Sequence, residues 1–263
     1  MKERFTPGCV RLALAAVALS LAVGGTVWAQ SGTARGSGAP AAPHRPRVKV
    51  DPDTGLPPGM PDLRGVWTNR WIVNMADGRF VEKTVEVPFT EKGRRIYAER
   101  TGNFQRDDPN FKCWPSGLPR QGGTPYPLKI MQTPEEVVFL YEGGMHTFRI
   151  VPTDGRSHKK DAWVWYGDSV GRWEGDTLVV ESNNFVDGGW LDVWGSPLTD
   201  EGKITERFTR PRFGELNIAI TIDDPKAYTE PFTVGVTQRI MVDQELIEFI
   251  CNEYNRAIEH VSR

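Results

Sequence analysis

The sequence predicts an all-β domain of mainly antiparallel strands, closed into a barrel or stacked as a sandwich, with short helices and one long loop. Many short stretches are rich in Val, Ile, Thr and aromatic residues, and turns containing Gly, Asp or Pro separate them. Apolar and polar residues alternate along 215–222, as in a strand with one buried face. Strand patterns do not alternate with long helical ones, which argues against a parallel doubly wound sheet.

The first 29 residues have the pattern of a secretory signal peptide. Basic residues come first, an apolar run fills 12–23, and Val27 and Ala29 precede the expected cleavage site at Gln30. A retained anchor helix is the alternative, but the apolar run is short for a membrane span. We therefore expect an exported protein, periplasmic or secreted, with no stable membrane span after the signal is removed.

Residues 30–60 are predicted to be a disordered linker, and residues 61–263 a single domain. The stretch 31–58 is rich in Gly, Pro, Ala and Arg and has almost no large apolar residue, so it cannot bury a core. Without residues 1–29, the 32 basic and 34 acidic residues of the chain become 29 and 33, and no basic stripe is present. This charge pattern argues against a nucleic-acid partner.

The predicted elements follow one another at short intervals. The expected strands are 63–73, 81–87, 128–131, 136–141, 145–151, 162–166, 172–173, 177–181, 203–209, 215–222, 232–241 and 245–250. Thr90 is the expected N-cap of a helix over 91–100, and 252–260 is a second predicted helix. The Pro- and Gly-rich stretch 103–126 is predicted to be a long surface loop or lid, and loops of this length are usually functional or disordered.

Strand alternation places four polar side chains on faces that are otherwise apolar. They are Gln132, His146, Glu206 and Gln238, and His146 shares its predicted face with Phe148 and Ile150. Burying a lone polar or charged group is costly, so these residues either pair inside the domain or face a wet cavity. Gln132 and Gln238 are then candidate ligand contacts. A structural network, or a register shift of one residue that inverts a strand, is the alternative.

Tryptophans supply further candidate ligand contacts. Trp163 and Trp165 share one face of a predicted strand, and Trp190 and Trp194 lie in a Gly-rich segment typical of a barrel mouth. Aromatic faces suit apolar, aromatic or sugar ligands. Packing in a wide barrel is the alternative explanation for these side chains.

If the protein is an enzyme, it needs a general base, and His146 and His158 are the candidates. Asp154 or Glu206 would orient that base, and Arg172 would bind an oxyanion or a substrate carboxylate. The turn from Asp154 to His158 is equally consistent with an ordinary polar hairpin turn.

Arg149 and Arg207 are less favoured as catalytic residues, because alternation places them opposite His146 and Glu206. Ser169 lacks the GxSxG context of a serine hydrolase, and the Walker loop, GxGxxG and HExxH motifs are absent. No residue spacing is diagnostic of a metal site, so neither a metal nor another cofactor is predicted.

Cys113 and Cys251 are the cysteines that remain after residue 29, and in an oxidising compartment two cysteines often pair. Closing so long a loop is worth about 5 kcal/mol in the chain-entropy model. Two buried free thiols are the alternative.

Gly65-Val66-Trp67 is similar to the G-x-W start of lipocalins and related calycins. A wider set of motifs resembles a family of exported bacterial proteins of unassigned function. These motifs are Pro61-Asp62-Leu63-x-Gly65-x-Trp67, Cys113-x-Pro115-x-Gly117-x-Pro119-Arg120, Asp154–His158, Gly167–Val180, Glu206–Arg210 and Cys251–Asn255. The resemblance spans the predicted domain and implies an exported, lipocalin-like β-barrel, but no settled activity. The chain departs at Pro197-Leu198-Thr199, where that family tends to have a histidine after the proline.

These observations favour an exported β-barrel that binds a small apolar or aromatic molecule. The alternative is a cofactor-independent lyase, isomerase or hydrolase with a His/Glu/Arg site in the barrel cavity. A third hypothesis is a structural or envelope-assembly protein, which would have a filled interior and no pocket.

Overall fold

The computed structural model describes residues 49–68, 74–75, 86–103, 106–123, 125–143, 147–161 and 164–251, all within one compact unit, Arg47–Arg263. Several sequence predictions lie outside these residues. They are the signal peptide, most of the linker, most of the strand 81–87, the helix 252–260, His146 and Trp163.

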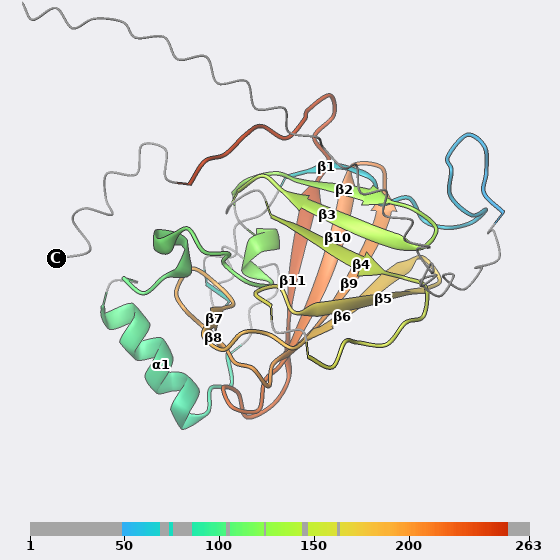
Figure 1. The fold of residues 1–263 in the computed structure, drawn as a ribbon. Helices are drawn as coiled ribbons and strands as arrows, with labels where there is room; N and C mark the ends of the chain where they lie inside the picture. The colour runs from blue at the N-terminus through green and yellow to red at the C-terminus, as the bar shows by residue number, and fades with distance from the viewer. Residues whose placement is uncertain are drawn as a thin grey trace, which may run out of the picture. The chain divides into compact units, whose positions relative to one another are not determined.

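Two antiparallel sheets form the body of the molecule (Figure 1). The first has the order β1-β2-β3-β4, formed by β1 (Gly65–Trp67), β2 (Leu128–Gln132), β3 (Glu136–Tyr141) and β4 (Phe148–Pro152). The second has the order β11-β10-β9-β6-β5, formed by β5 (Asp168–Glu174), β6 (Thr177–Asn183), β9 (Lys203–Arg212), β10 (Glu215–Asp223) and β11 (Phe232–Arg239). The mainly antiparallel all-β prediction is confirmed.

The two sheets meet along one pair of edges. Trp67 at the end of β1 bridges to Ile240, and the backbone N–H of Met241 donates to the carbonyl of Val66 at 2.8 Å. At the other pair of edges, β4 packs beside β5, but no hydrogen-bonded ladder joins these two described strands. A closed barrel is therefore not seen among the described strands, and the lipocalin-like barrel remains a prediction.

The helix predicted after Thr90 is confirmed as α1 (Glu91–Gly102). The Thr90 side chain accepts a hydrogen bond from the Gly93 N–H at 3.0 Å, which satisfies one of the free donors of the first turn. Figure 1 shows α1 beside the small hairpin of β7 (Gly189–Trp190) and β8 (Pro197–Leu198), which the sequence analysis does not predict. Two 3₁₀ turns, η1 (Pro109–Lys112) and η2 (Arg120–Gly123), lie in the long loop.

The predicted strand 245–250 is wrong. These residues belong to a segment, 241–251, that we call the strap, and none of 242–251 belongs to a strand. Individual side-chain contacts, instead of a hydrogen-bonded ladder, attach the strap to the domain. Lys129 pairs with Glu245 at 2.6 Å, and the Glu142 carboxylate accepts a hydrogen bond from the Ile247 N–H at 2.9 Å. The predicted strand 162–166 is likewise reduced, in its described part, to one bridge between Val164 and Phe185.

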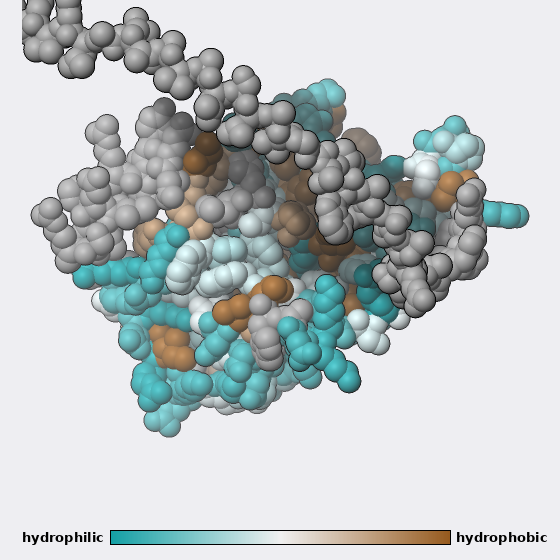
Figure 2. Space-filling model, in the orientation of Figure 1, coloured by the Kyte–Doolittle hydropathy of each residue, from teal (hydrophilic) through white to brown (hydrophobic). Residues whose placement is uncertain are grey.

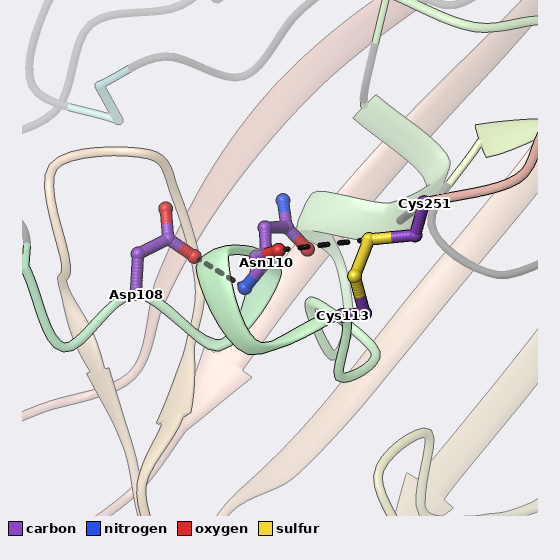
Figure 3. Close-up of a disulfide and its surroundings, with 4 residues drawn as sticks. All are labelled: Asp108, Asn110, Cys113 and Cys251. Carbon is purple, nitrogen blue, oxygen red and sulfur yellow. Dashed lines mark hydrogen bonds between the residues drawn. A yellow bond between two sulfur atoms is a disulfide. The ribbon is translucent and has the colours of Figure 1, made fainter. Parts of the chain in front are cut away.

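The strap ends in a disulfide between Cys113 and Cys251, as expected from the two cysteines (Figure 3). Around it, the carboxylate of Asp108 accepts from the Asn110 N–H at 2.9 Å and caps the 3₁₀ turn η1. The disulfide thereby links the C-terminal part of the domain to the long Pro- and Gly-rich loop.

The last part of the predicted linker has defined structure. The Asp51 carbonyl accepts from the Gly55 N–H at 2.7 Å, and Leu56 is buried at 2% exposure. The buried Leu56 and a hydrogen bond from Nη1 of Arg64 to the Thr54 carbonyl at 2.9 Å attach this turn to the domain, although the stretch has almost no other large apolar residue.

Candidate functional site

A cavity with polar side chains in its wall lies between the two sheets. Its apolar lining comes from Leu128, Phe139, Phe208, Ile218, Ile220 and Val236. Its polar lining comes from Tyr141, Arg149, Glu206 and Gln238. The cavity holds about 20 Å³ of open space, which is enough for about one water molecule.

Arg149 enters the cavity because β4 has the opposite orientation to the one predicted. The expected inward residues Phe148 and Ile150 are 60% and 45% exposed, whereas Arg149 is 4% and Val151 0% exposed. Figure 2 shows the hydrophobic surface over the region of β3 and β4. In most strands the more apolar face points inward. In β4 the outward face carries the larger apolar side chains, so the predicted assignment of the inward face is wrong by one residue.

Glu206 is the partner of Arg149 across the cavity. Its strand β9 has the predicted orientation, with Ile204 and Phe208 buried on the same face. Nη1 of Arg149 donates to Oε2 of Glu206 at 2.6 Å, and the guanidinium lies over the ring of Phe139 at 4.7 Å. Burial lowers the pKa of Arg149, but the charge and hydrogen bond of Glu206, together with Tyr141 and Tyr166, more than offset this and raise the pKa above its ordinary value. The group is therefore a permanent buried cation.

Most of the hydrogen-bonding capacity of Arg149 is unused. Its Nε and Nη2 atoms are buried and have no hydrogen-bond partner among the residues that the structure describes. These two atoms lie on the same edge of the guanidinium and form the fork that binds planar anions. Leaving buried donors unpaired costs about 1–3 kcal/mol or more for a charged group, so a water molecule or a polar ligand group at this position would stabilise the guanidinium.

Tyr141 and Gln238 complete the polar part of the wall. Burial is the main cause that raises the pKa of Tyr141 to about 12, so its hydroxyl stays protonated near neutral pH. Gln238, predicted as a ligand contact, lines the cavity, and its Nε2 donates to the carbonyl of Gly122 at 2.9 Å. Gln238 therefore holds the long loop, through Gly122, against the cavity.

Residues 116–123 of the long loop, which we call the cover segment, close one side of the cavity. Pro119 and Gly122 line the cavity directly. Gln121 is fully buried, donates to the carbonyl of Gly143 at 2.8 Å and accepts from the Ser116 hydroxyl at 2.6 Å. The disulfide at Cys113 also ties the described part of the long loop to the strap.

The other described residues of the predicted catalytic set, His158, Asp154 and Arg172, do not line the cavity. Nδ1 of His158 is 3.1 Å from the carboxylate of Asp168, not of Asp154. Asp154 pairs instead with Arg156 at 2.7 Å. Arg172 is half exposed on β5, where it pairs with two glutamates, Glu174 and Glu181. Of the predicted catalytic set, the described structure brings only Glu206 to the cavity.

The described tryptophans do not line the cavity either. Trp190 is buried, with the guanidinium of Arg100 over its ring at 4.9 Å, and is a packing residue. Trp165 contacts the exposed Trp114 at 5.7 Å between ring centroids, and Trp194 is 41% exposed. Phenylalanine and tyrosine form the aromatic wall instead. Trp67, by contrast, is fully buried in the hydrophobic core without lining the cavity.

Gln132, the other predicted ligand contact, has a structural position. Its amide accepts from the Leu63 N–H at 3.0 Å and donates to the Pro61 carbonyl at 2.9 Å. It therefore attaches the segment before β1 to the end of β2. Gln132 is buried, as strand alternation predicts. Burial alone, however, does not distinguish an amide that binds the backbone from one that faces a ligand.

The described residues contain no cluster of three or more His, Cys, Asp or Glu side chains suited to a metal ion. Among the described helices, none is both long enough and apolar enough to cross a membrane. Comparison of the chain with protein-family models, with curated proteins and with solved structures finds no significant match. The resemblance to lipocalins and to an exported bacterial family therefore stays a prediction.

Proposed function

We propose that this protein is an exported small-molecule-binding protein whose ligand occupies the space between the two sheets. The observation that carries the proposal is the buried guanidinium of Arg149 beside an apolar wall, because its Nε and Nη2 atoms have no partner in the described part of the chain. Binding sites commonly combine such apolar walls with a few polar groups that orient the ligand. The signal-peptide pattern and the disulfide support export.

Binding is favoured over catalysis because a general base is missing from the described cavity wall. His158 lies elsewhere, and Glu206 is held by Arg149. A purely structural domain is less favoured, because a filled interior would not need the buried cation of Arg149 with two of its donor nitrogens unpaired in the described structure. The open volume admits about one water molecule, so an organic ligand enters only if the cover segment moves.

The first test is native mass spectrometry of the mature protein, followed by titration with an apolar fluorescent probe. Val236→Phe adds a phenyl ring inside the cavity wall, and Val164→Phe makes the same change at a position that is 46% exposed. We expect V236F to weaken probe binding at least tenfold and V164F to leave it unchanged. Equal binding by both variants, or no binding by the parent protein, would contradict the proposal.

A further inference from the structure

The unpaired edge of Arg149 specifies the shape and charge of the group that would satisfy it. The side chain is 3% exposed, and Nη1 is already committed to Glu206. The Nε and Nη2 donors are parallel and lie in one plane. A carboxylate offers two coplanar oxygens at the matching spacing, and this pairing is among the strongest hydrogen-bonded contacts in proteins.

The rest of the wall fits an apolar body attached to that group. Phe139 and Phe208 approach each other at 5.2 Å between ring centroids, and the aliphatic residues of β10 and β11 continue the surface away from Arg149. Glu206, which is negative, is the only other charged residue among the described residues of the lining. A second anionic group on the ligand would therefore meet no cation in this lining.

We infer that the ligand is an apolar or aromatic monocarboxylic acid, bound by its carboxylate to the Nε and Nη2 atoms of Arg149. This inference rests on the proposed function and adds the chemical class of the ligand. Glu206 then has a defined effect, since it orients the guanidinium through Nη1 but also repels the incoming carboxylate.

The test uses isothermal titration of the full mature protein with two pairs of probes: benzoate with benzamide, and octanoate with octanamide. We expect each acid to bind at least about tenfold more tightly than its amide, as a charge-assisted bidentate contact implies. Arg149→Lys keeps the charge but removes the fork, and should reduce this ratio to about threefold or less. Arg207→Lys is the matched control, because Arg207 lies on the outer face of β9 and pairs with Glu174.

Glu206→Gln keeps a hydrogen-bond acceptor for Arg149 and removes the repelling charge. This variant should bind the acids more tightly, by about threefold or more, and the amides as before. This variant also keeps the inference testable if R149K fails to fold, because loss of folding cannot produce the tighter binding of the acids that we expect from E206Q. Acids and amides that bind equally well would overturn the inference while leaving the proposed function in place. If none of the four probes binds, both fail.

Discussion

At the residue scale, a full charge pair lies in the wall of the cavity between the sheets, where apolar side chains would pack more simply. Arg149 and Glu206 are both almost completely buried, and a pair of this kind often contributes little net stability. Removing one partner is much more harmful, because the other charge is then buried alone. The pair is thus better explained by what the unpaired edge of Arg149 binds than by stability.

Arg149→Met should destabilise the protein by about 3 kcal/mol, because it leaves the Glu206 carboxylate unpaired in the cavity. The double variant with Glu206→Leu should recover most of this loss. Urea unfolding of the two variants and of the parent protein measures both effects. A double variant as unstable as R149M would show that the cost comes from lost packing and not from the unpaired charge.

The buried tyrosine gives the stability a defined pH dependence. The folded protein holds the pKa of Tyr141 at about 12, against 10.0 for the free side chain. Between pH 10 and 12 the unfolded chain loses this proton and the folded protein keeps it, so stability falls as pH rises through that window. Tyr141→Phe should reduce the slope by about 1.4 kcal/mol per pH unit. Equal slopes in urea titrations of parent and variant would contradict this assignment.

Alternation along single strands correctly places three of the four predicted polar side chains on buried faces, and the fourth, His146, lies outside the described residues. Gln132, Glu206 and Gln238 are buried as expected. The same rule is wrong for β4, because it places the buried Arg149 on the outer face and so disfavours it as a site residue. The strand is short and carries Phe148 and Ile150 outside, so its sequence gives no signal for the correct face. Only the pairing of β4 with β3 places Arg149 opposite Phe139, inside the molecule.

At the element scale, α1 is attached to the body by an unusually close approach at one glycine. A Cβ atom on Gly93 would lie 2.1 Å from the carbonyl oxygen of Ala227, whereas a Cβ on Gly102, in the same helix, would meet nothing within 4 Å. We expect Gly93→Ala to destabilise the protein by about 2 kcal/mol or more. Gly102→Ala should be neutral or stabilise it by up to about 1 kcal/mol. Thermal unfolding that ranks the two variants in the opposite order would refute this close contact.

The strap and the cover segment depend on the disulfide between Cys113 and Cys251. Replacing both cysteines with alanine should cost about 2–5 kcal/mol and should increase hydrogen exchange in the cover segment. Lys129→Met is the control, since the exposed pair of Lys129 with Glu245 is worth less than about 1 kcal/mol. Unchanged exchange in the cover segment would mean that the disulfide does not restrain it.

The sequence predicts the helix at Thr90 and most strands, because capping and alternation are local signals. It does not predict that 245–250 remains outside the sheets, because its apolar residues look like a strand. The outcome depends on distant partners, Lys129 and Glu142, which a local pattern cannot include.

At the scale of the whole molecule, the two sheets enclose an interior but differ in how firmly their edges are joined. β9 and β10 have hydrogen-bonded neighbours on both sides, whereas among the described strands β4 and β5 each have such a neighbour on one side only. Native-state hydrogen exchange should therefore be slowest in β9 and β10 and faster in β4 and β5. Uniform protection across all these strands would indicate a closed barrel.

The fold class follows from composition and turn spacing, but the cavity does not. Its wall comes from six strands and one loop, and its volume depends on how closely the cover segment packs on Gln238. The expected aromatic lining is present as Phe139, Tyr141 and Phe208, and not as the tryptophans, because residue type alone does not say which layer a ring occupies.

The most direct test of the account is a crystal structure of the mature protein grown with octanoate. We predict density for its carboxylate on Nε and Nη2 of Arg149, with the alkyl chain along Phe139, Phe208 and β10, and a displaced cover segment. An interior that holds only water on Arg149, with the cover segment in place at saturating octanoate, would contradict the central claim that this cavity is a ligand site.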